Sequence, residues 1–106
     1  MGVLELSVTL NALIVALCLD YPRRKNAIKE GRLSRRTDVE FRYINSKMYD
    51  AAAEIVGEEL AEVYIKEIGE KIGYAYSEVE DLSEVTYKIN KRKVKEEIAK
   101  RLYLTE

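Results

Sequence analysis

Hydrophobic residues recur every three or four positions along most of this chain, which is the spacing of amphipathic α-helices. The clearest stripe runs from Phe41 to Ile55, and comparable patterns predict helices over residues 4–19, 58–72 and 84–104. The sequence contains no strand-like alternation of useful length. We therefore predict an all-α fold, a compact bundle of about five or six helices.

Two polar residues mark the clearest predicted helix start. Thr37 and Glu40 have the spacing of a capping box, in which the hydroxyl accepts from an exposed backbone N–H and the carboxylate reaches back to another. They predict a helix over about residues 38–56, which should end at Gly57.

Proline limits the first helix. Because the residue before a proline is disfavoured in the helical region, the helix that begins near Leu4 is expected to end near Leu19, ahead of Pro22. A basic turn over residues 22–36 should follow. Ser83 is expected to cap the last helix.

Residues 65–84 have the spacing of a helix-turn-helix, so we expect a hairpin of that kind within the bundle. Gly69 would let two helices approach closely, and Gly73 is expected to take the left-handed conformation at the turn. A short second helix is predicted from Ser77 to about residue 82. Ordinary helical hairpins match the same pattern, so this stretch suggests DNA binding without establishing it.

The composition fits a single folded domain over residues 1–106, with 47% hydrophobic and 35% charged residues. A lone cysteine, Cys18, excludes an intrachain disulfide and fits a reducing cytoplasm. The uninterrupted apolar run Ala12–Leu19 is too short to cross a bilayer, so no membrane association is expected. We interpret it as part of a core helix, with a hydrophobic partner-binding helix as the alternative.

Charge is segregated along the chain although the net charge is only −1. Residues 1–47 and 85–106 each carry a net +4, whereas residues 48–84 carry −9. Glutamates, Glu67 among them, are expected to form an acidic outer face on the 58–72 helix. Such a distribution suits a protein that lies against a polyanion or associates head to tail with copies of itself.

Residue types that usually carry catalysis are scarce. The chain has no histidine, and it has no glycine-rich phosphate loop and no paired metal-ligand spacing. The carboxylates between residues 50 and 84 are at helical spacing, which is typical of a solvated face. We expect a non-enzymatic protein with no cofactor, no metal and no small-molecule substrate.

Basic residues in two regions are candidates for contacting DNA. In the last helix, basic side chains at spacings of three and four share one face, and polar residues near its start are placed to touch base edges. The basic turn would contribute phosphate contacts that position the protein without reading sequence. The candidates are Thr86, Tyr87, Lys88, Lys91, Arg92 and Lys95 in the helix, and Arg23, Arg24, Lys25, Arg35 and Arg36 in the turn.

Which element reads the DNA is left open by the sequence. If the 65–84 hairpin is the reader, its second helix brings carboxylates to a backbone with about one charge per 1.7 Å, which is repulsive. The 83–95 region is the alternative reader. A basic face that only solubilises the helix would have the same pattern.

The segment from Asp81 to Ala99 resembles the end of phage-encoded transcriptional regulators of the ArpU/RinA type, and more distantly the last DNA-binding region of sigma factors. The resemblance lies in Leu82-Ser83-Glu84-Val85-Thr86-Tyr87 leading into a basic helix with an apolar far end. It implies that Ser83, Thr86 and Tyr87 begin the reading helix and that Lys88, Lys91 and Arg92 lie on DNA.

Two functions follow as hypotheses. The first is a small DNA-binding protein of phage or prophage origin, a transcriptional regulator acting as a homodimer on duplex DNA. The alternative is a non-enzymatic all-α interaction or assembly protein whose acidic 54–84 face meets the basic ends of a neighbour. DNA binding requires the two basic regions to share one exposed face, whereas assembly requires an exposed apolar patch on the first helix or on the 41–55 stripe.

Overall fold

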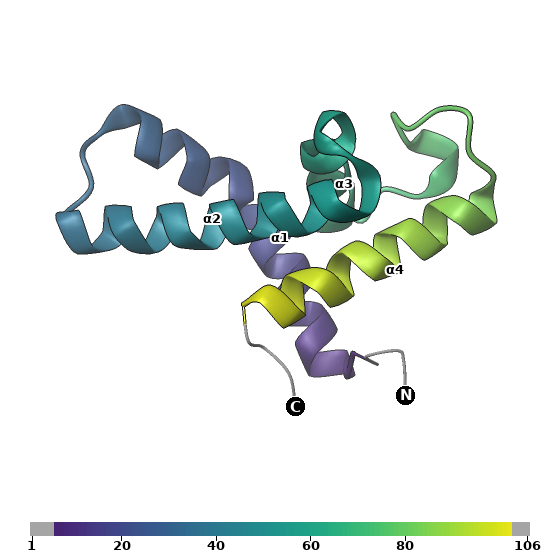
Figure 1. Cartoon of the computed structure of the whole chain (residues 1–106), viewed down its shortest axis with the longest axis horizontal. Coiled ribbons are helices and arrows are strands. Elements are labelled where there is room, and N and C mark those ends of the chain that lie inside the picture. Colours follow the sequence, from purple (N-terminus) through teal and green to yellow (C-terminus); the bar gives the residue numbers. More distant parts are fainter. Residues whose placement is uncertain (1–5, 103–106) are drawn as a thin grey trace.

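The computed structural model describes residues 6–102, which form four α-helices and one 3-10 turn (Figure 1). The all-α prediction is confirmed, and within the described residues four α-helices replace the five or six expected. The elements are α1 (Val8–Glu30), α2 (Arg35–Val56), α3 (Glu58–Gly69), η1 (Tyr74–Tyr76) and α4 (Glu84–Arg101).

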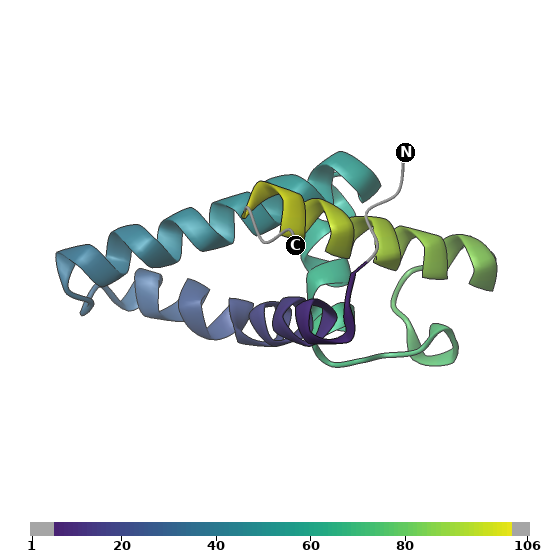
Figure 2. The same cartoon turned by 90° about the horizontal axis from the view of Figure 1, so that it is seen from below.

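The helices pack in two layers around a short crossing helix. Figure 2 shows α2 and α4 together on one side and α1 on the other, with α3 running between them. α2 contacts both α3 and α4, and α1 packs against α3 and α2. The molecule is elongated, with a longest extent of 43 Å, and the α1–α2 turn lies at one end of it while the start of α4 lies at the other (Figure 1).

Every helix contributes to a shared core. Its largest fully buried hydrophobic side chains are Ile14 of α1, Met48 of α2, Tyr64 and Ile65 of α3, and Tyr87, Val94 and Ile98 of α4. The stripe predicted on α2 is confirmed at its centre, where Met48 and Ala52 are fully buried. Burial of such side chains, each removing its apolar area from water, is the main stabilising contribution to the fold.

The predicted end of the first helix is wrong, because α1 continues through Pro22 to Glu30. Proline removes one backbone hydrogen bond and costs about 3 kcal/mol inside a helix. Tertiary contacts offset that cost, since Tyr21 and Arg24 on either side of the proline are both buried. Gly31, in the left-handed conformation at φ 70°, ends the helix. The predicted start at Leu4 lies outside the described residues.

α2 begins at Arg35, three residues earlier than predicted. Ser34 is the cap, and its hydroxyl oxygen accepts a hydrogen bond from the Thr37 N–H at 3.3 Å. Thr37 therefore lies inside the helix. Either residue type can cap, and the earlier start adds a turn in which Arg36 pairs with Glu40. The predicted end at Gly57 is confirmed.

α3 ends earlier than predicted, at Gly69 instead of residue 72. The chain closes the helix with a backbone hydrogen bond from the Ile72 N–H to the Glu67 carbonyl at 2.9 Å, and Lys71 takes the left-handed conformation at φ 57°. Gly73, which was expected there, is extended at φ −83°.

The helix-turn-helix predicted over residues 65–84 does not form. Residues 77–82 are not helical, and residues 70–83 separate α3 from α4, whereas a helix-turn-helix has a turn of about three or four residues. Ser77 does not cap a helix. Its hydroxyl donates to the Glu67 carboxylate, and its oxygen accepts a hydrogen bond from the Val79 N–H at 2.9 Å in a local turn.

Gly69 is nevertheless a site of close approach, as its small size predicted. The partner is α1: a Cβ atom at Gly69 would lie 2.6 Å from the Leu19 Cα and 2.7 Å from the Cys18 carbonyl carbon. α3 therefore rests directly on the backbone of α1.

α4 begins as predicted. The Ser83 hydroxyl oxygen accepts a hydrogen bond from the Thr86 N–H at 3.2 Å, which confirms it as the cap. The helix ends at Arg101, and the predicted end at Leu104 lies outside the described residues. Within residues 6–102, none of the four helices combines the length and hydrophobicity that a membrane span requires.

Candidate nucleic-acid interface

A buried carboxylate holds the start of α4 in place. Glu67 of α3 is fully buried and accepts three hydrogen bonds, from the Tyr87 hydroxyl at 2.7 Å, the Ser77 hydroxyl at 2.6 Å and the Glu78 N–H at 2.7 Å. These bonds tie α3, the 70–83 connection and α4 together. The prediction that Glu67 belongs to an acidic outer face is therefore wrong.

The surroundings of Glu67 favour its charged form. Burial acts to raise the pKa of this carboxyl, but the hydrogen bonds from Ser77, Tyr87 and the Glu78 backbone outweigh burial and leave the pKa lowered. Burial and the bond to Glu67 raise the pKa of Tyr87 to about 12. The pair is thus a neutral phenol donating to a carboxylate.

Three of the candidate residues in α4 make contacts inside the protein. Tyr87 is buried, so it does not reach a base edge as predicted. The Lys91 Nζ donates to the Ile72 carbonyl at 2.7 Å and lies 5.1 Å from the centroid of the Tyr87 ring. The Lys95 Nζ donates to the Asn11 side chain at 2.9 Å, which joins α4 to α1. Burial, with the Lys95 charge acting in the same direction, lowers the pKa of Lys91.

The outward face of α4 carries the remaining candidates. Its exposed residues over the first three turns are Glu84, Val85, Thr86, Lys88, Ile89, Arg92 and Lys93. Lys88 pairs with Glu84 at 2.7 Å, which partly neutralises it. Within residues 6–102, Arg92 and Lys93 form no ion pair. Lys93 was not among the predicted contacts, although its place beside Arg92 in a basic run was a signal for it.

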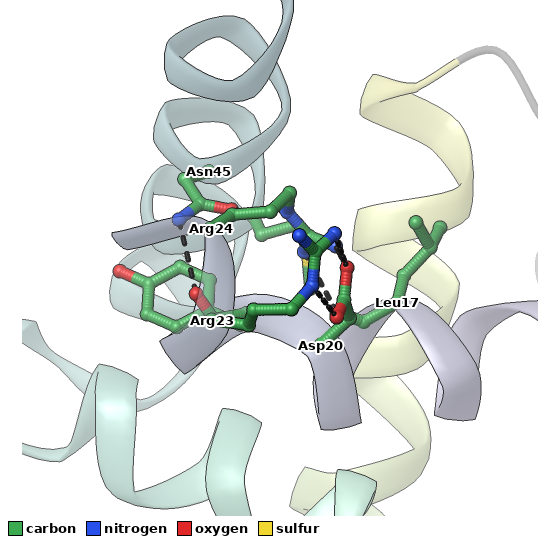
Figure 3. A network of polar contacts seen from close by, with 7 residues as sticks. Leu17, Asp20, Arg23, Arg24 and Asn45 are labelled. Atoms are coloured by element: carbon green, nitrogen blue, oxygen red, sulfur yellow. Dashed lines mark hydrogen bonds and ion pairs between the residues drawn. The ribbon is translucent and has the colours of Figure 1, made fainter. Parts of the chain in front are cut away.

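Arg24 is a structural residue inside the molecule. Figure 3 shows its guanidinium between α1 and α2, where it donates to the Asn45 Oδ1 at 2.7 Å, the Asp20 carboxylate at 3.0 Å and the Leu17 carbonyl at 2.7 Å. Its side chain is only 3% exposed. Burial lowers its pKa, but a guanidinium stays charged at neutral pH. Arg24 is therefore unavailable to DNA, contrary to the prediction.

Replacing Arg24 by lysine should lower the free energy of unfolding by about 1–3 kcal/mol, because an ammonium lacks the planar fork that satisfies three acceptors at once. Urea denaturation measures this loss. Arg35→Lys, at an exposed position, is the matched control and should stay within about 0.5 kcal/mol of the parent. A loss equal to that of the control would contradict the structural role of Arg24.

The other basic residues of the 22–36 region are exposed but largely paired. Arg23 binds Asp20 through two hydrogen bonds (Figure 3), and Lys25 pairs with Glu62 at 2.6 Å. Arg36 pairs with Glu40, and Arg35 is exposed at the start of α2.

The two basic regions do not form a common surface. Arg35 and Arg36 open α2 at one end of the long axis, whereas Lys88 and Arg92 lie in the half of α4 at the opposite end (Figure 1). The expectation that both basic regions form one DNA-binding face is therefore wrong. A DNA-binding hypothesis must instead depend on the outward face of α4 alone, without the basic residues of the 22–36 region.

The apolar patch expected for an assembly protein is present on α1. Val8, Ala12, Ala16 and Leu19 are exposed on the side of α1 that no other helix covers. Within the described residues no group of three or more histidine, cysteine, aspartate or glutamate side chains is arranged to hold a metal. Comparisons with family models, curated proteins and solved structures found no match for this chain.

Proposed function

We propose that the protein binds duplex DNA through the outward face of the first three turns of α4. The observation that carries the proposal is the division of this helix into two sides. Tyr87, Val94 and Ile98 hold one side in the core. The other side presents basic, polar and apolar residues and one acidic residue to solvent: Glu84, Val85, Thr86, Lys88, Ile89, Arg92 and Lys93. A rigidly held helix with a basic, solvent-facing side is suited to enter a major groove.

The residues of this face fall into two groups, according to the part of the DNA that each can contact. Arg92 and Lys93 suit phosphate oxygens, which account for most of the affinity of DNA-binding proteins. Thr86 and Ile89 suit base edges, where a hydroxyl reads polar groups and an apolar side chain reads a thymine methyl. Glu84 is less repulsive to DNA than its charge suggests, because Lys88 pairs with it. A role in phage transcription, which the resemblance of residues 81–99 implies, is part of the same proposal.

A double variant, Arg92→Glu with Lys93→Glu, reverses the two basic charges that form no ion pair within residues 6–102. It should bind a labelled duplex at least about tenfold more weakly than the parent. Each lost phosphate contact should also reduce the slope of log K against log salt by about 0.9, so the slope should fall by about 2. Fluorescence anisotropy at several salt concentrations measures both quantities. Circular dichroism checks that the variant remains folded.

A matched control variant makes the same change in net charge at the other end of the molecule. Arg35→Glu with Arg36→Glu should leave most of the affinity intact, because these residues lie far from the outward face of α4 (Figure 1). Equal losses in the two double variants would mean that only the net charge matters. Absence of binding by the parent protein at low salt would remove the proposal altogether.

A further inference from the structure

One face of α1 is apolar and exposed over about three turns. Val8 is 89% exposed and Leu19 is 59% exposed, and Ala12 and Ala16 lie between them on the same side. Their spacings of four, four and three residues place them in one stripe along the helix. No charged residue occurs from Val8 to Leu19. We call these four residues the α1 stripe.

Within residues 6–102, no other element covers the α1 stripe. α1 forms the layer opposite α2 and α4 (Figure 2), and it buries Leu10, Ile14 and Cys18. The stripe lies on the opposite side of the helix from these buried residues, so it faces away from the core. Single exposed hydrophobic residues are common on protein surfaces, but a contiguous stripe that excludes charge marks an interaction surface.

We propose that the α1 stripe binds the same stripe of a second copy of this chain, with the two α1 helices antiparallel. A twofold interface requires a patch that is complementary to itself. The order of residues along the stripe is large, small, small, large, which is the same read from either end. A twofold axis between Ala12 and Ala16 therefore sets each alanine against the partner's other alanine and sets Val8 beside the partner's Leu19.

Both electrostatics and shape favour a second copy as the occupant. Antiparallel helices oppose their macrodipoles favourably, and two uncharged stripes bury no unpaired charge. Beyond Leu19 the first charged groups are Asp20 and Arg23, which already neutralise one another at 2.6 Å. A partner of different chemistry, such as an acidic or basic peptide, would find no opposite charge on the stripe.

The α1 stripe is long enough to form the centre of a dimer interface of ordinary size. At about 1.5 Å per residue, the stripe extends for about 17 Å along α1, in a molecule whose longest extent is 43 Å. Specific interfaces usually cover about a tenth of the surface of a small protein. The inference does not depend on DNA binding, because the stripe and the outward face of α4 share no residue.

Sedimentation velocity over a range of concentrations tests the association. The parent protein should form a dimer, and Ala16→Arg, which places a charge at the centre of the stripe, should raise the dissociation constant by at least about tenfold. Position 16 is exposed, so the variant should unfold at the same urea concentration as the parent. Ala75→Arg, another exposed alanine outside the stripe, should dimerise like the parent. A parent that remains monomeric, or an Ala16→Arg variant that dimerises normally, would overturn the proposal.

Cross-linking tests the antiparallel orientation. Val8→Cys and Leu19→Cys proteins, mixed and treated with a short bismaleimide, should give mixed dimers, whereas Val8→Cys alone should not, since two copies of residue 8 lie about 18 Å apart along the helices. The native Cys18 should not interfere, because it is buried and burial raises its pKa to about 12. Efficient cross-linking of Val8→Cys with itself would instead indicate a parallel pair.

Discussion

Gly69→Ala should lower the free energy of unfolding by about 2–3 kcal/mol, although alanine is the better helix former. The added Cβ would lie 2.6 Å from the Leu19 Cα and 2.7 Å from the Cys18 carbonyl carbon. These are backbone atoms of α1 and cannot rotate away as a side chain would. α3 and α1 must therefore separate, and overpacking of this kind outweighs the gain of about 1 kcal/mol in helix propensity. Urea denaturation followed by circular dichroism measures the change.

Gly73→Ala is the matched control for Gly69→Ala. Gly73 is extended at φ −83°, and a Cβ there would meet nothing within 4 Å. The alanine should stabilise the protein slightly, by about 0.4–1 kcal/mol, because it restricts the unfolded chain. Equal destabilisation by the two substitutions would contradict the close approach of α3 to α1.

Glu67→Gln should be the second strongly destabilising change, by about 2 kcal/mol at neutral pH. Glutamine keeps the size of the side chain but offers one acceptor oxygen where the carboxylate offers two to the Tyr87, Ser77 and Glu78 donors. It also removes the charge that strengthens these bonds. Glu70→Gln, at an exposed position of the next turn, should remain within about 0.5 kcal/mol of the parent.

The effect of Glu67→Gln should depend on pH in a defined direction. The pKa of Glu67 is lowered in the folded protein from an ordinary value of 4.5, so the stability that its charge contributes is complete above about pH 4.5. That contribution is lost as the pH falls through the lowered folded pKa, and glutamine does not titrate. The difference in stability between parent and variant should therefore narrow in acid. A difference that stays constant between neutral and acidic pH would contradict the role of the charge.

Local features of the chain were predictable where each signal lies within one helix. The spacing of apolar residues predicted the buried side of α2 around Met48 and Ala52. Ser83 predicted the start of α4, and Gly57 the end of α2, because capping groups act on backbone atoms within one turn. The all-α class followed from the same periodicity.

Predictions failed where contacts between distant segments override local preference. α1 passes through Pro22 because Tyr21 and Arg24 are anchored to α3 and α2, through Glu62 at 2.8 Å and Asn45 at 2.7 Å. Ser77 has the residue type and spacing of a helix cap, but Glu67, ten residues earlier, accepts from both the Ser77 hydroxyl and the Glu78 N–H and so holds this segment in the connection between α3 and α4.

In the candidate interface, too, the sequence predicted the local pattern and the tertiary structure decided the contacts. The helical periodicity of α4 predicts that its basic residues share one face, because residues three and four apart lie on the same side of a helix whatever surrounds them. The sequence does not show which of these residues form hydrogen bonds inside the protein. That depends on which backbone carbonyl or side chain of a distant segment lies within hydrogen-bonding distance. Lys91 donates a hydrogen bond to the Ile72 carbonyl, and Lys95 donates one to the Asn11 side chain. Packing between distant segments therefore occupies these two lysines, whereas Arg92 and Lys93 face solvent.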